Sequence, residues 1–235
     1  KSRNHPAWRA QYLRRLAAIQ SPSFFHHHGA TMTETFPAFF AAAPTLRVRD
    51  PLAAFLGAAQ DGILEYHYAD AVRLAGHSCP TVAGAYLLTR RGLRALYGDA
   101  LPERGGIAVQ MRDSRDSGTT GVIAAVATLL TGAAAETGFG GIGPAARFTR
   151  RNLLDYDAPI RGLMALRRLD NGASVELELN AAVVSFPAEM QSLMPKAVSG
   201  QATPDELARF GELWQARVRV MLLEHADDPE LLQVL

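Results

Sequence analysis

Residues 160–180 contain two strand-like runs joined by an Asn-Gly dipeptide, and this pattern predicts an antiparallel pair of strands. The run IRGLMALRRL precedes Asp170-Asn171-Gly172, and ASVELELN follows it. Asn-Gly is favoured in tight hairpin turns because both residues tolerate the left-handed backbone conformation. We therefore expect a β-hairpin at this place.

Other segments alternate between strand and helix patterns. TLRVR, GILEYHY and GGIAVQMR are short and apolar or alternating, which is typical of strands, and VIAAVATLLTG predicts a helix that stops at Gly132. Helices are also expected over residues 36–43 and 51–59, and from Pro80 to about Tyr97. The order indicates an α+β fold, with a mixed sheet, flanking helices and a helical C-terminal portion. We expect an N-terminal arm or extension at residues 1–31, an α+β core at 32–180 and a helical segment at 181–235.

The C-terminal segment contains a strong helix start at Thr203-Pro204-Asp205-Glu206. Threonine at the N-cap, proline at the first helical position and glutamate at the third form a capping box. The helix that follows has a wide apolar face, made by Leu207, Phe210, Leu213, Trp214, Val218, Met221 and Leu222. This face needs the core or a second copy of the chain to cover it, and we expect a homodimer.

Composition excludes several classes of protein. The 235 residues are 48% hydrophobic and 20% charged, with a formal net charge of +1, which is typical of a globular chain and does not favour nucleic acid. No apolar run approaches the roughly 20 residues of a membrane-spanning helix. The single cysteine excludes an internal disulfide framework and favours a reducing compartment, so we expect a cytoplasmic protein.

The stretch LAGHSCPTVAGAY, residues 74–86, carries the chemistry of most interest. With Pro80 as the first helical residue, Cys79 becomes the N-cap, where free N–H groups and the helix dipole favour a thiolate. The chain before a proline is extended, so His77 and Cys79 point to the same side. They form a candidate metal or catalytic pair. The alternative is that Cys79 is a small buried hydrophobe and His77 bonds a carbonyl.

The same stretch resembles the FmdE family, which takes its name from a component of formylmethanofuran dehydrogenase. The hallmark of that family is a His-Gly-His-x-Cys-Pro-Gly block that opens a helix, followed by a strand, an acidic loop with a cysteine, and a helix ending in Leu-Thr-Gly. GHSCPTVAGAY, IAVQMRDSRDSG and VATLLTG match these features over roughly residues 65–154. The resemblance implies an α+β core with a metal at His77 and Cys79.

Three positions depart from the family pattern. Ala75 replaces the first histidine, the acidic loop has no cysteine, and Ala133 follows the Leu-Thr-Gly where many members have another cysteine. His67 is the candidate third metal ligand, and Asp113 and Asp116 are candidates for oxygen ligands or cofactor contacts, although such loop aspartates more often cap turns. The histidines of the arm, His26, His27 and His28, could also bind metal.

These residues allow three functions. The first is metal binding, zinc above all, at a His/Cys site with open positions, which would permit catalysis on a small-molecule substrate. The resemblance to the FmdE family implies that this substrate belongs to one-carbon or redox metabolism. The second is a metal-free enzyme with Cys79 as nucleophile and His77 or His67 as base. The third is a protein that binds haem or another bulky cofactor in the same pocket.

Overall fold

Helix α4, Pro80–Tyr97, runs through the centre of the structure, a computed structural model that describes residues 35–235. Residues 82–89 along it are all buried. Two of its glycines face the sheet: a Cβ at Gly84 would lie 2.4 Å from a methyl carbon of Leu179, and one at Gly92 would lie 2.5 Å from a methyl carbon of Leu177. The absence of side chains at these two positions lets the helix approach the sheet closely.

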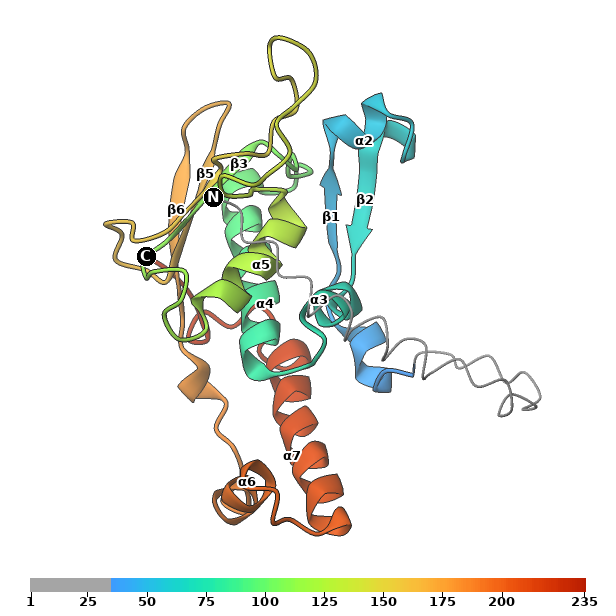
Figure 1. Cartoon of the computed structure of the whole chain (residues 1–235), viewed down its shortest axis with the longest axis vertical. Helices are drawn as coiled ribbons and strands as arrows, with labels where there is room; N and C mark the ends of the chain where they lie inside the picture. The colour runs from blue at the N-terminus through green and yellow to red at the C-terminus, as the bar shows by residue number, and fades with distance from the viewer. Residues whose placement is uncertain (1–34) are drawn as a thin grey trace, which may run out of the picture. The chain divides into compact units, whose positions relative to one another are not determined.

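The main sheet has five strands in the order β4-β3-β5-β6-β7. Its strands are β3 (Ile107–Met111), β4 (Leu154–Asp155), β5 (Met164–Arg168), β6 (Ser174–Leu179) and β7 (Leu232–Val234). Only the β3–β4 pair is parallel, so the sheet is mixed. Figure 1 shows the sheet on one side of α4 and α5 (Thr120–Thr131).

A two-stranded sheet lies on the other side of these helices (Figure 1). Its antiparallel strands are β1 (Leu46–Arg49) and β2 (Ile63–Tyr66), joined through helix α2 (Pro51–Phe55) and the 3-10 turn η2 (Gln60–Gly62). The hydroxyl of Tyr86 on α4 donates to the carbonyl oxygens of Pro44 and Tyr66, at 2.8 and 3.0 Å. These bonds fix the small sheet to the central helix.

The remaining N-terminal elements cover one end of α4. They are the 3-10 helix η1 (Ala38–Ala42) and helix α3 (Tyr68–Ala75). Helix α3 ends at Gly76, which has the left-handed φ of 75° common at helix C-termini, and α5 ends in the same way at Gly132.

The C-terminal part contains η3 (Ala181–Val183), α6 (Met190–Val198) and α7 (Pro204–Leu223). The second half of α7 places Val218, Met221 and Leu222 in the main core, and its first half extends beyond the body, with α6 packed across it (Figure 1). Met190 and Leu193 of α6 bury Leu213 in a second, smaller core.

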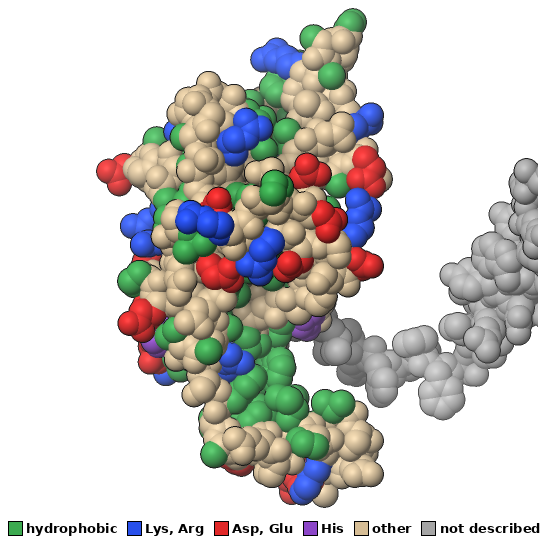
Figure 2. All heavy atoms as spheres, turned by 90° about the vertical axis from the view of Figure 1, so that its left-hand side faces the viewer, with side chains coloured by type: hydrophobic (Ala, Val, Ile, Leu, Met, Phe, Trp, Pro, Cys, Tyr) green, Lys and Arg blue, Asp and Glu red, His purple; other side chains and the backbone are tan. Residues whose placement is uncertain are grey.

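The chain thus covers much of the apolar face of α7 by itself, while Leu207 stays 48% exposed. Figure 2 shows hydrophobic side chains gathered at the surface where the α6–α7 extension leaves the body. Of the two possible covers expected from the sequence, the core covers the second half of the helix, and a homodimer stays a prediction.

The α+β fold and the mixed sheet predicted from the sequence are confirmed. The hairpin is present, but its turn is wider than the Asn-Gly dipeptide suggested. The N–H of Arg168 donates to the oxygen of Ala173, so four residues form the connection, and of these only Gly172 has a positive φ. Asn171 instead accepts a hydrogen bond from the N–H of Ala173 through its side chain.

The sequence does not individually predict the short strands β4 and β7, helix α6 or the 3-10 turns η2 and η3. Within the described part of the chain, no helix combines the length and the apolar character needed to cross a membrane.

Candidate functional site

The turn between α3 and α4 carries the predicted pair His77 and Cys79. The last residue of α3 is Ala75, with Gly76 as its C-cap, and Pro80 is the first residue of α4, so four residues connect the two helices. Cys79 has an extended backbone, with φ of −149° and ψ of 168°. Extended backbone is what the proline imposes on the residue before it, so the predicted helix start is confirmed.

The sulfur of Cys79 caps α4. Its Sγ accepts a hydrogen bond from the N–H of Val82 at 3.4 Å, and the residue is 8% exposed and packs within the main core. The sulfur therefore occupies the place of an N-cap oxygen, next to the positive end of an 18-residue helix. The burial of Cys79 agrees with the alternative interpretation of this residue, a small buried hydrophobe, and the contact with the Val82 N–H agrees with its interpretation as the N-cap.

His77 lies on the surface of the same turn. Its Nδ1 is 3.0 Å from the carbonyl oxygen of Ala75, which can only accept a hydrogen bond. Nδ1 therefore carries the proton in the neutral ring, and the lone pair is on Nε2. A histidine held in this way by a carbonyl has a fixed ring and a free Nε2, as metal-binding histidines commonly do.

Ser78, between the two predicted residues, connects the turn to α7. Its hydroxyl donates to Oε1 of Gln215 at 2.9 Å and shares a hydrogen bond with the hydroxyl of Tyr68. Its carbonyl oxygen accepts from the indole N–H of Trp214 and from Nε2 of Gln215, each at 3.1 Å. These bonds fix the backbone of the turn on which His77 and Cys79 are placed.

Tyr68 contributes a neutral hydroxyl to this network. The side chain is fully buried, and burial raises the pKa of its hydroxyl well above the ordinary value, against the hydrogen bond with Ser78, which lowers it. Sequence reasoning missed Ser78 and its partners. The one signal was Trp214, whose N–H needs an acceptor when it faces the core, but the sequence does not say which acceptor.

The third predicted metal ligand, His67, has a local partner. It precedes α3, where its N–H donates to Asp70 at 2.8 Å, and its ring Nε2 lies 3.3 Å from Oε1 of Glu65. Its backbone therefore forms part of a helix cap, and its ring faces a carboxylate on β2.

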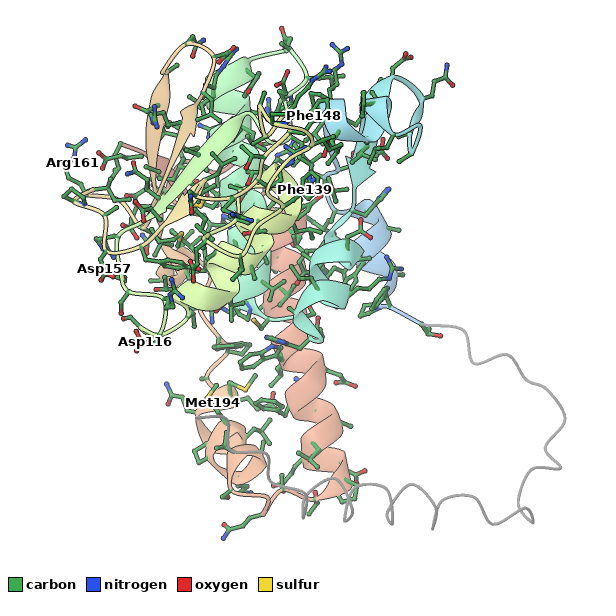
Figure 3. All side chains as sticks on the ribbon, turned by 45° about the horizontal axis from the view of Figure 1, so that its top comes forward. Asp116, Phe139, Phe148, Asp157, Arg161 and Met194 are labelled. Carbon is green, nitrogen blue, oxygen red and sulfur yellow. The ribbon has the colours of Figure 1, made fainter. Side chains whose placement is uncertain are left out.

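The two predicted loop aspartates are also paired locally. Asp113 lies 3.4 Å from Nε of Arg112. Asp116 accepts from the hydroxyl of Ser114 at 2.8 Å, which lowers the pKa of its carboxyl, and it points outward at the edge of the molecule (Figure 3).

The structure does not bring the predicted ligands into one cluster. Among residues 35–235, no three His, Cys, Asp or Glu side chains are arranged to hold a metal ion. His26, His27 and His28 lie outside the described residues. Four cavities of the described part have volumes of about 170–520 Å³, and none of these four is lined by His67, His77 or Cys79.

Comparison of the sequence with protein-family models and with curated proteins finds no match. The resemblance to the FmdE family therefore remains a prediction from the motifs at residues 74–86, 107–118 and 126–132.

Proposed function

We propose that the chain binds one divalent transition-metal ion, zinc in the first place, through Sγ of Cys79 and Nε2 of His77. The observation that carries this proposal is the pairing of a cysteine at the N-cap of α4 with a histidine, two residues earlier, whose Nδ1 is bonded to Ala75. The N–H of Val82 and the positive end of α4 point toward the sulfur, and the thiolate is the form of cysteine that binds metal.

Thiolate and imidazole are donors that zinc prefers, but a structural zinc ion takes four ligands. Because no three His, Cys, Asp or Glu side chains among the described residues are arranged to hold a metal ion, we propose an open site with Cys79 and His77 as its two protein donors, and not a closed structural one. Solvent or an oxygen of a bound small molecule would complete the coordination, and a bound metal would then supply a Lewis acid. As part of the same proposal, the protein acts in the cytoplasm as a homodimer, on a small molecule of one-carbon or redox metabolism.

The experiment is zinc binding by equilibrium dialysis of the full chain. We expect about one zinc per chain for the wild type, and loss of that zinc in Cys79→Ala and in His77→Gln. The matched control is His225→Gln, because His225 is bonded to Asp228 at 2.6 Å, far along the chain from the turn. A variant with His26, His27 and His28 all changed to glutamine should keep its zinc.

The other outcomes assign the site differently. Zinc lost only in the triple variant would place metal binding in the arm and overturn the proposal. If the purified protein holds no metal and its Cys79 is alkylated rapidly near pH 6, the result would favour the metal-free enzyme in which Cys79 is the nucleophile. If added haem gives an absorption band with the wild type that disappears in Cys79→Ala, the result would favour a protein that binds haem through Cys79.

A further inference from the structure

A second candidate site lies at the opposite end of α4 from the His77–Cys79 turn. A cavity of about 520 Å³ is bounded by the end of β1, the residues after α4, the loop that leads to β3 and the turn of the β5–β6 hairpin. Its lining includes Arg49, Tyr97, Leu101, Glu103, Arg168 and Leu169. Its volume is that of a small-molecule site.

Arg49 supplies a cation that no described residue neutralises. Its backbone is fixed on both sides, because its N–H donates to the oxygen of Pro102 at 2.9 Å and its oxygen accepts from the N–H of Arg104 at 2.8 Å. Its guanidinium makes no hydrogen bond or ion pair with the residues that the structure describes, whereas the Arg168 guanidinium in the same cavity is held by Asp170. Arg49 is thus an anchored arginine with free donors.

The wall behind the cavity carries further positive charge. Asp50 is buried between two guanidinium groups, those of Arg104 and Arg150, at 2.9 and 2.6 Å. Arg150 lies directly against Gly105 of the cavity lining, where a Cβ would come within 0.9 Å of its Nη1. These two guanidinium groups and one carboxylate therefore leave one positive charge uncompensated.

The carboxylates near the cavity do not cancel this excess. Four guanidinium groups, on Arg49, Arg104, Arg150 and Arg168, face three carboxylates, on Asp50, Glu103 and Asp170. The local charge thus suits an anion with one negative charge.

The remaining lining is apolar. Leu101 and Leu169 are 38% and 44% exposed, and the Arg168 guanidinium lies 4.0 Å from the centre of the Tyr97 ring. We propose that this cavity binds a small carboxylic acid, with its carboxylate paired to Arg49 and its apolar body against Leu101 and Leu169. A carboxylate matches the single free guanidinium in bidentate geometry. A doubly charged phosphate would meet the repulsion of Glu103 with only one free partner.

The test uses three probes with the same phenylpropyl body: 3-phenylpropionate, its amide and 3-phenylpropylamine. Each is titrated into the full chain while backbone N–H chemical shifts are recorded by NMR. We expect saturable shifts at residues 97–106 and 168–170 with the carboxylate, and binding weaker by about tenfold or more for the amide and the amine.

Arg49→Gln should weaken carboxylate binding by about the same factor, since it removes the charged donor. Arg47→Gln is the matched control, because Arg47 is on the same face of β1 but lies near Glu65. Leu169→Ala should weaken the binding of 3-phenylpropionate and of its amide by the same factor. Absence of saturable shifts, equal affinity for carboxylate and amide, or an unchanged affinity in Arg49→Gln would each overturn the proposal.

Discussion

The guanidinium of Arg150 donates through Nη2 to Oδ1 of Asp50 at 2.6 Å, across 100 residues of sequence. Both residues are buried, at 7% and 3% exposure. Asp50 also accepts from Arg104 and from the N–H groups of Leu52 and Ala53 at the start of α2. This carboxylate therefore joins the two-stranded sheet to the long loop before β4.

Asp50→Asn is expected to destabilise the protein by about 3–5 kcal/mol, because it leaves the buried guanidinium of Arg150 and the partly buried one of Arg104 close together without a counter-charge. The measurement is urea unfolding at pH 7. The control is Asp170→Asn, which removes the carboxylate of the exposed pair with Arg168 and should change the urea concentration at the unfolding midpoint little. Equal effects of the two substitutions would contradict the structural role of Asp50.

The same carboxylate should make stability depend on pH. Burial raises the pKa of Asp50, but the hydrogen bond from Arg104 and the charge of Arg150 outweigh it and hold the pKa below its ordinary value of 3.8. A group with a lowered folded pKa stabilises the protein above its unfolded pKa and loses this contribution as pH falls through the folded value. The difference in unfolding free energy between wild type and Asp50→Asn should therefore be constant from pH 7 to about 5 and shrink below about 4. If this free-energy difference stayed constant down to pH 3, the result would contradict a lowered pKa of Asp50 in the folded protein.

Gly92→Ala tests the contact between α4 and the sheet. Alanine normally favours a helix over glycine by about 1 kcal/mol, but here its Cβ would lie 2.5 Å from a methyl carbon of Leu177 and 2.7 Å from one of Leu166. We expect a net loss of about 1–3 kcal/mol from overpacking. Gly211→Ala on α7, where nothing lies within 4 Å of the new carbon, should instead raise the melting temperature. If Gly92→Ala also raised the melting temperature, this would contradict the close packing of α4 on the sheet.

Local signals in the sequence predicted the elements that depend on local chemistry. Pro80 and the Thr203–Glu206 capping box indicated the starts of α4 and α7, and Gly132 indicated the end of α5. Strand β7 carries no such signal. It is three residues long, and it exists because Leu232 and Val234 pair with β6, which a periodicity argument cannot detect.

The same limit applies to the candidate site: its local features could be predicted from the sequence, and its long-range contacts could not. The N-cap position of Cys79 follows from Pro80, but the burial of its sulfur depends on the core around it. The network at Ser78 depends on Gln215, which is 137 residues away. The free guanidinium of Arg49 depends on which carboxylates the fold brings near it, and no sequence spacing encodes that.

Ser78→Ala tests the network that fixes the turn. The substitution removes the bonds to Tyr68 and Gln215 and leaves a buried tyrosine hydroxyl without this partner, so we expect a loss of about 1–3 kcal/mol. Ser192→Ala on α6 is the control, because that exposed hydroxyl bonds only to the Glu189 carbonyl of its own helix. Thermal unfolding of both variants provides the comparison. Equal melting temperatures of Ser78→Ala and wild type would show that the turn does not depend on these bonds.

Metal binding by Cys79 is tested most directly by the absorption of the cobalt(II)-substituted full chain. Because the chain has one cysteine, any sulfur-to-cobalt charge-transfer band must come from Cys79. We expect this band to saturate at one equivalent of cobalt, to persist when His26, His27 and His28 are changed to glutamine, and to weaken in His77→Gln. Cobalt binding at one equivalent without a sulfur band, or no binding at all, would contradict a metal site at the start of α4.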